Sequence, residues 1–232
     1  MPIHSLCRII SKMGVMSRKQ AAEAIVAGSV IVNGKTAKSP NLRVSTDAEI
    51  LINNKPIQKP EKIYLLLNKP INYVVTRKDE RGRKTIYQLL KTSQWLFPVG
   101  RLDYETSGLI LLTNDSNFAE YLTNPESHIW KTYIAKTRSN ISSEEITLLK
   151  NGVRLSEGIT LPAKVKRLSD SEVEISIREG KNRQIRRMLA AIGNKARSLK
   201  RVAIGDLADD ALKSGCYKII GKEEIKRLFP NV

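Results

Sequence analysis

The sequence has few of the residues from which metal, redox and disulfide sites are built. Its 232 residues include two cysteines and two histidines, Cys7, Cys216, His4 and His128, which are scattered along the chain. None of them belongs to a CxxC pair or a histidine motif, so no zinc site is expected and the cysteines are interpreted as reduced thiols. A glycine-rich phosphate-binding loop is also missing.

Long apolar segments are equally scarce. The apolar runs, such as residues 109–112, are far too short to cross a membrane. Cys7 and Arg8 lie where an export signal would need continuous apolar residues. These features predict a cytoplasmic protein without a membrane partner.

Basic side chains are abundant by contrast. The chain has 40 lysines and arginines against 23 aspartates and glutamates, which gives a formal net charge of +17 at pH 7. An excess of this size indicates a polyanionic partner such as nucleic acid. Hydrophobic residues make up 41% of the chain, which is enough for packed cores, and the length suits two small domains.

Residues 1–59 are predicted to form a separate module. Apolar residues at helical spacing predict a first helix at 6–13. Ser17 and Gln20 have the spacing of a capping box at the start of a second helix, which Gly28 is placed to end. Short strands are predicted at 30–32 and 50–52, and Asn33-Gly34 is a strong hairpin signal.

This module is itself basic. Residues 4–59 hold nine lysines and arginines against three acidic residues. Arg18 and Lys19 fall in the first turn of the second helix, where backbone N–H groups also favour a phosphate. They are therefore candidate nucleic-acid contacts, although a solvated helix face would have the same pattern.

Residues 60–232 are predicted to form a second domain that mixes helices and strands. A polar segment with two prolines, 56–61, resembles a linker. Buried strands are predicted at 63–67 and 109–113, and alternating patterns predict strands at 130–135 and 173–177. The alternation at 130–135 places Lys131 and Tyr133 on one face.

One segment, VGRLDYETSGLILLTND at 99–115, concentrates candidate chemistry. Asp103 is predicted to lie on a loop just ahead of a buried strand, with the residues 106–108 turning the chain into that strand. Loops held by rigid strands commonly carry catalytic groups. An aspartate in such a loop is, taken alone, more often a turn or cap residue.

A second segment, EGKNRQIRRMLAAIG at 179–193, predicts an amphipathic helix. Gly180 is expected to end the preceding strand and Asn182 to cap the helix. Arg183, Arg186 and Arg187 then cluster near the positive end of the helix dipole, which requires a nearby phosphate or carboxylate. Arginines that simply face water are the alternative.

These motifs together resemble a known family. GRLDYETSGLILLTND, KTY at 131–133, and EGKNRQIRRM with the later LKRVAIG are similar to ribosomal pseudouridine synthases of the RsuA/RluB type. The segment GVMSRKQAAEAIVAGSVIVNGK at 14–35 resembles the S4-type RNA-binding domain that these enzymes carry. The likeness covers nearly the whole chain in the expected order.

The resemblance implies an α+β fold: an S4-like module, then a catalytic domain with a bent, mostly antiparallel sheet and a central cleft. It implies Asp103 as the nucleophile, paired with Arg186, and Tyr133 stacking on the uracil or moving a proton at C5. Arg101 would enter the RNA as the target nucleotide flips out. Further expected RNA contacts are Lys131, Arg183, Arg187, Arg18 and Lys19.

The family chemistry needs no metal, redox cofactor or ATP, so none is expected. The expected partner is ribosomal RNA or a ribosomal subunit precursor, read at a single-stranded loop. The QIRRM helix at 184–188 and the short C-terminus slightly favour large-subunit RNA. A monomer is expected.

Two other functions fit parts of the pattern. A non-catalytic RNA-binding ribosome assembly factor explains the charge and the module, but not the family residues at Asp103, Tyr133 and Arg186. A metal-dependent nuclease using Asp103, Glu105 and Asp115 would place Asp115 beyond a buried strand, more than about 20 Å from Asp103 at strand spacing.

Overall fold

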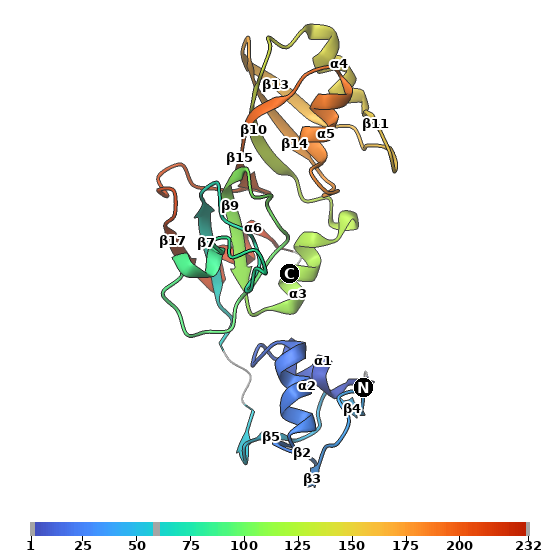
Figure 1. The fold of residues 1–232 in the computed structure, drawn as a ribbon, viewed down its shortest axis with the longest axis vertical. Coiled ribbons are helices and arrows are strands. Elements are labelled where there is room, and N and C mark those ends of the chain that lie inside the picture. Colours follow the sequence, from blue (N-terminus) through green and yellow to red (C-terminus); the bar gives the residue numbers. More distant parts are fainter. Residues whose placement is uncertain (1–2, 58–60, 231–232) are drawn as a thin grey trace. The chain divides into compact units, whose positions relative to one another are not determined.

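The protein consists of two compact units, seen in a computed structural model that describes residues 3–57 and 61–230 (Figure 1). One unit comprises Met1–Ile63 with the short segments Ser93–Phe97 and Thr113–Ser116. The other comprises Tyr64–Thr92, Pro98–Leu112 and Asn117–Val232. The expected linker at 56–61 and the expected boundary after residue 59 fall mostly on residues 58–60, outside the described residues.

The N-terminal unit packs two helices against short strands. Its elements are β1 (Ile3–Ser5), α1 (Leu6–Lys12), α2 (Arg18–Val26), β2 (Val30–Val32), β3 (Lys35–Thr36), β4 (Arg43–Ser45), β5 (Ile50–Ile52) and β6 (Lys55–Pro56). β1 pairs with β4, and the other strands form a sheet in the order β3-β2-β5-β6. Both helices contribute to one core with these strands, around Leu6, Ile10 and Ile25.

The local signals in this unit are confirmed. Ser17 Oγ accepts from the Gln20 N–H at 3.1 Å and Gln20 Oε1 accepts from the Ser17 N–H at 3.1 Å, so the capping box is complete. Asn33 and Gly34 have φ of 47° and 77° between β2 and β3. These conformations are what a two-residue hairpin of this kind requires.

The second unit is built on a nine-stranded sheet with the order β13-β14-β10-β15-β9-β7-β17, to which β16 and β8 add at β15 and β9. The strands are β7 (Tyr64–Lys69), β8 (Phe97–Pro98), β9 (Thr106–Thr113), β10 (Lys131–Thr137), β13 (Lys164–Ser169), β14 (Glu172–Ile177), β15 (Ala196–Ile204), β16 (Leu207–Ala208) and β17 (Tyr217–Ile220). β15 runs parallel to β9 and antiparallel to β10. The α+β class and the largely antiparallel sheet are confirmed.

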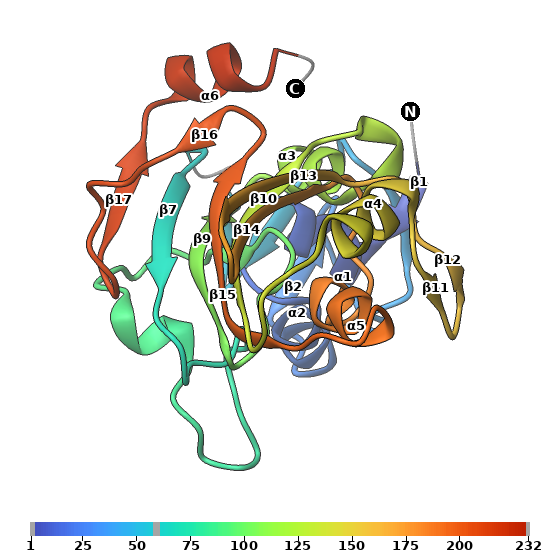
Figure 2. The same ribbon diagram turned by 90° about the horizontal axis from the view of Figure 1, so that it is seen from above.

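Different helices cover the two halves of this sheet, one half around β10, β13 and β14 and the other around β7 and β9 (Figures 1 and 2). They are α3 (Ser116–Thr123), α4 (Ser143–Asn151), α5 (Gln184–Ala191) and α6 (Lys222–Leu228), with short 3-10 turns at Ile86–Leu89 and Pro125–Ser127 and a small hairpin of β11 (Arg154–Leu155) and β12 (Gly158–Ile159). α4 and α5 bury apolar side chains against β10, β13, β14 and β15. Phe118 of α3 touches Tyr64 and Phe229 edge-on, which ties α3 and the end of α6 to β7.

Three local predictions in this unit are wrong. Residues 106–108 are already part of β9 rather than a turn, because Gly108 at φ +106° lets the backbone of Arg201 pass within 2.1 Å of where a Cβ would stand. β14 ends at Ile177, before Gly180. Arg183, in a left-handed conformation with φ of 48°, is the N-cap of α5, in place of Asn182. Within the described ranges, no helix is both long and apolar enough to cross a membrane.

Candidate active-site cleft

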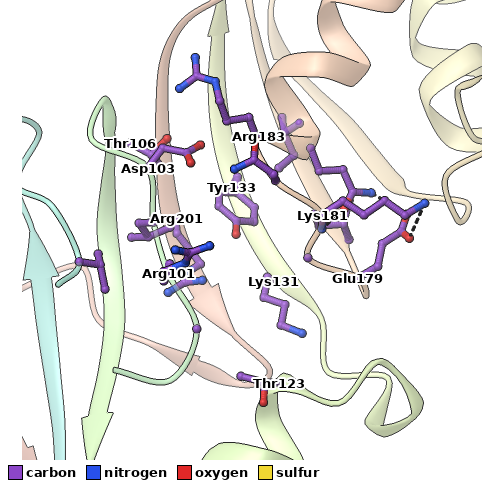
Figure 3. Close-up of a pocket in the computed structure, with 18 of the residues that line it drawn as sticks. Arg101, Asp103, Thr106, Thr123, Lys131, Tyr133, Glu179, Lys181, Arg183 and Arg201 are labelled. Carbon is purple, nitrogen blue, oxygen red and sulfur yellow. Dashed lines mark hydrogen bonds and ion pairs between the residues drawn. The ribbon is translucent and has the colours of Figure 1, made fainter. Parts of the chain in front are cut away.

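A large cleft opens between the two halves of the second unit's sheet (Figure 3). Its volume is about 1020 Å³, at the upper end of the range for small-molecule sites. Loop residues 99–104, the start of β10, the middle of β15 and residues 177–185 ahead of and into α5 all line it. The expected site residues Arg101, Asp103, Lys131, Tyr133 and Arg183 all lie in this lining.

The loop that carries Asp103 is fixed through three successive backbone carbonyls. The Thr106 N–H donates to the Asp103 carbonyl at 3.1 Å, and the Asn72 N–H donates to the Tyr104 carbonyl at 2.8 Å. Arg186 Nη2 donates to the Glu105 carbonyl at 3.0 Å. These donors, from the start of β9, the turn after β7 and α5, fix the backbone of the loop and so the position of Asp103 at the cleft, as a catalytic group requires.

Lys69 stands behind this loop and was missed by the sequence analysis. It is the last residue of β7 and is completely buried. Its Nζ donates to the carbonyls of Pro70 and Tyr73, at 2.9 Å each, and so braces the turn from which Asn72 reaches the Asp103 loop. Burial lowers the pKa of Lys69 to about 8, while the nearby Asp103 carboxylate works in the opposite direction. The sequence feature that could have identified Lys69 is a lysine placed at the end of an apolar strand.

Tyr133 and Lys131 of β10 and Arg201 of β15 also line the cleft. Tyr133 and Lys131 lie on one face of β10, as predicted, and Tyr133 projects into the cleft (Figure 3). Arg201 of β15 is 5% exposed and its guanidinium carbon lies 6.0 Å from the Tyr133 ring centroid. Burial and the Arg201 charge lower the pKa of Lys131.

Arg201 is a second residue that the sequence analysis did not single out. Its Nε donates to the Leu109 carbonyl at 2.6 Å. Its Nη2 is buried without a hydrogen-bond partner among the described residues, although the residue lines the cleft. An unpaired buried donor of this kind is costly unless a ligand supplies the acceptor.

Arg101 occupies a different position from the other cleft cations. It is exposed, and its side chain makes no ion pair with any described residue. Figure 3 shows it close to Arg201, on the Asp103 side of the cleft. The Arg101 side chain is therefore not held by an ion pair with any described residue, as an inserting residue would need to be.

The three arginines at the start of α5 are divided between two carboxylates. Arg183 Nη2 binds Glu105 Oε2 at 2.9 Å, Arg186 Nη1 lies 4.0 Å from the same oxygen, and Arg187 is paired with Glu157. The anion predicted near the start of this helix is therefore supplied, in the free protein, by the carboxylates of Glu105 and Glu157. Arg186 lines a second, smaller cavity rather than the cleft, and Arg187 lines neither.

Arg186 is nevertheless electrostatically linked to Asp103. Burial lowers the pKa of the Arg186 guanidinium, and the charges of Glu105 and Asp103 oppose that effect. An arginine stays charged under these conditions. Its contribution to Asp103 is therefore a positive charge together with the bond to the Glu105 carbonyl.

Arg18 and Lys19 belong to the N-terminal unit, where both are exposed at the start of α2. The residues named for a nuclease are not gathered either, since Asp115 is buried in an ion pair with Lys62 at 2.6 Å. In the part of the chain that the structure describes, no group of three or more histidine, cysteine, aspartate or glutamate side chains is placed to hold a metal ion.

Comparisons with known proteins match both units. A family described as RNA pseudouridylate synthase matches residues 63–191, and the S4 domain family matches residues 6–50. Ribosomal large subunit pseudouridine synthase B of Bacillus subtilis is 40% identical over 230 residues, covering 96% of this chain and 94% of its own. Ribosomal small subunit pseudouridine synthase A of Haemophilus influenzae is 34% identical over 229 residues, covering 96% and 98%.

A solved structure is also similar. The crystal structure of a pseudouridylate synthase superimposes with a TM-score of 0.72 at 33% identity, covering 97% of this chain and 99% of that one. The similarity therefore extends over the N-terminal unit as well as the unit that holds the cleft.

Proposed function

Because this chain belongs to the RNA pseudouridylate synthase family, we propose that it isomerises uridine to pseudouridine in ribosomal RNA, with Asp103 as the nucleophile. The observation that carries the assignment of Asp103 is its position: a carboxylate on a loop held at three successive carbonyls, at the wall of a cleft of about 1020 Å³. The names of the relatives support ribosomal RNA as the substrate.

The reaction breaks the bond between ribose C1′ and uracil N1, rotates the base, and joins C1′ to C5. The proton that leaves C5 is balanced by the proton that N1 gains, so no co-reactant is consumed. The Asp103 carboxylate attacks C1′ or the base, or removes a ribose proton to give a glycal; each route needs its ionised form. Lys69 and Arg186 place positive charges close to the Asp103 carboxylate.

Tyr133 and Arg201 are proposed to hold the uracil. The Tyr133 ring offers a stacking surface inside the cleft and its hydroxyl a route for the C5 proton. The unpaired Arg201 Nη2 suits a carbonyl oxygen of the base. Arg101, Lys131 and Arg183 supply positive charge along the cleft for the flanking phosphates. Arg101 is proposed to fill the gap left by the flipped nucleotide.

Lys69 gives the reaction a specific pH dependence. Its charge is present below about pH 8 and is lost as the pH rises through that value, so kcat/KM is expected to fall there. In the Lys69→Met variant the methionine side chain fills the space of the buried lysine, but the positive charge is missing at every pH. The variant should be slower at pH 7 and should lack the decline near pH 8, in single-site assays between pH 6 and 9.

The titration of the RNA itself is common to both proteins, so the wild type and Lys69→Met are compared on one substrate. Identical pH profiles would show that the Lys69 charge does not act on Asp103.

The N-terminal unit is proposed to bind RNA through phosphate contacts that include Arg18 and Lys19. Neutralising both in the full chain should weaken binding and reduce the slope of log K against log salt by about 1.4, since each contact to single-stranded RNA contributes about 0.7. Fluorescence polarisation at several salt concentrations measures this. Lys222→Ala/Arg227→Ala on α6, which removes the same charge outside both cavities, is the matched control.

Equal salt slopes for the two double variants would show that Arg18 and Lys19 do not contact RNA phosphates.

We further propose that the enzyme acts as a cytoplasmic monomer, and that large-subunit RNA is the substrate. The higher identity to the large-subunit relative, 40% against 34%, supports this preference. Incubating the protein with transcripts of both ribosomal RNAs, followed by pseudouridine mapping, tests it. Modification of the small-subunit transcript alone would reverse the preference. No pseudouridine in either transcript would favour an assembly factor or a substrate that exists only in a precursor particle.

A further inference from the structure

The Asp103 loop separates the cleft from a second cavity. Asp103, Tyr104 and Thr106 line the cleft, whereas Glu105 and Ser107 line the other cavity. That second cavity has a volume of about 540 Å³ and is named here the basic groove; its charged residues are Glu105, Arg183, Arg186, Lys195 and Arg197. Arg183 and Leu199 line both cavities. The two cavities are therefore adjacent, with Arg183 and the Asp103 loop between them.

The charge of the groove is strongly positive. Four cations line it against one carboxylate, that of Glu105. Lys195 and Arg197 are exposed and form no ion pair with any residue the structure describes. Ser107, Ser198 and Asn72 add polar side chains to the same lining. Such a surface fits a polyanion better than an uncharged or cationic partner.

Glu105 occupies the centre of this positive field in the free protein. Its carboxylate accepts from Arg183 at 2.9 Å and lies 4.0 Å from Arg186. The Glu105 side chain is 59% exposed, so it is held mainly by the charges of Arg183 and Arg186. The hydrogen bond from Arg183 lowers the pKa of Glu105. A carboxylate and a phosphate present similar oxygens to a guanidinium, so one can replace the other.

The backbone of Arg183 supports the same interpretation. Arg183 has φ of 48° at the N-cap of α5, a conformation that residues other than glycine rarely adopt. Two other helices, α2 and α4, begin with conventional serine caps at Ser17 and Ser142. From its unusual N-cap position the Arg183 side chain lines both cavities.

We propose that the basic groove binds a backbone phosphate of the RNA strand next to the target nucleotide, and that Glu105 takes the place of this phosphate when RNA is absent. The inference rests on the proposed function for the identity of the polyanion. On RNA binding, Arg183 exchanges Glu105 for the phosphate, and Lys195 and Arg197 complete the site. Since Arg186 still holds the Glu105 carbonyl, the exchange leaves the Asp103 loop in place.

Two variants that remove the same charge test the exchange. Glu105→Gln removes the competing carboxylate from the groove, and Glu157→Gln removes the carboxylate paired with Arg187, which lines neither cavity. The probe is a fluorescent uridine-only RNA oligonucleotide, measured by polarisation. Glu105→Gln is expected to bind it about three- to fivefold more tightly, the effect of an exposed ion pair that no longer competes. Glu157→Gln should stay within about twofold of wild type.

Equal gains in the two variants would show only an effect of net charge and would overturn the proposal. So would an unchanged or weakened affinity in Glu105→Gln.

A third variant tests the groove without touching Glu105. Lys195→Ala/Arg197→Ala replaces two exposed side chains and should reduce the salt slope by about 0.7, the contribution of one phosphate contact to a single strand. An unchanged slope would place the RNA elsewhere. All of these experiments measure binding without turnover, so a failure of the groove is distinguishable from a failure of the proposed isomerase activity.

Discussion

The Asp103→Asn variant is expected to lose isomerase activity by about a thousandfold or more, while its RNA affinity stays within a few-fold of wild type. The substitution removes the carboxylate nucleophile but keeps the size of the side chain. The Asp103 loop is held through backbone carbonyls at Asp103, Tyr104 and Glu105, so the loop itself should not move. Pseudouridine formation in an rRNA transcript and binding of the same transcript are measured together.

Asp170→Asn is the matched control, since Asp170 is exposed and lines neither cavity. It should retain wild-type turnover and affinity. Turnover by Asp103→Asn above about a tenth of wild type would contradict the role given to Asp103.

The second large effect is expected on stability, at Gly108. A Cβ there would stand 2.1 Å from the Arg201 carbonyl oxygen and 2.5 Å from its nitrogen, at the parallel contact of β9 with β15. Backbone atoms cannot give way as a flexible side chain would. Gly108→Ala should therefore lower the free energy of unfolding by about 4 kcal/mol or more, measured by urea denaturation.

Gly158→Ala separates the clash from the backbone strain. Gly158 has φ of +119°, close to the +106° of Gly108, but a Cβ there would meet nothing within 4 Å. Its cost should be that of the conformation alone, about 1 to 3 kcal/mol. Equal losses in the two variants would mean that the β9–β15 contact relaxes.

The features that sequence could predict are those fixed by neighbouring residues. The capping box of Ser17 and Gln20 and the Asn33-Gly34 hairpin depend on three or four adjacent positions, and both are present. The strands around residues 64–69 and 106–113 follow from apolar runs. The family motifs located Asp103 and Tyr133, and both line the cleft.

The features that the sequence alone could not predict depend on contacts between distant parts of the chain. Gly108 was interpreted as a turn because the residue that requires it, Arg201, is paired with it only through the parallel sheet. The α5 arginines required an anion, but nothing local identified it as Glu105, 78 residues from Arg183. Lys69 looked like the end of a strand, and only the fold places it beside Asp103.

The predicted cap of α5 was wrong for a different reason. Asn182 has the side chain of a good cap, yet Arg183 takes that position because Gln184 and Glu179 organise the preceding residues. The Gln184 Oε1 accepts from the Lys181 N–H at 3.0 Å, and its Nε2 donates to Glu179 Oε1 at 2.6 Å. A local network of side-chain hydrogen bonds among residues 179–184 has therefore overridden the capping preference of Asn182.

The most direct test of the account is pseudouridine mapping of total ribosomal RNA, by carbodiimide labelling and primer extension, in cells with and without this gene. The account predicts that one site loses its pseudouridine on deletion and regains it with the wild-type gene but not with Asp103→Asn. Ribosomal RNA that is unchanged at every position on deletion, or fully restored by Asp103→Asn, would contradict it.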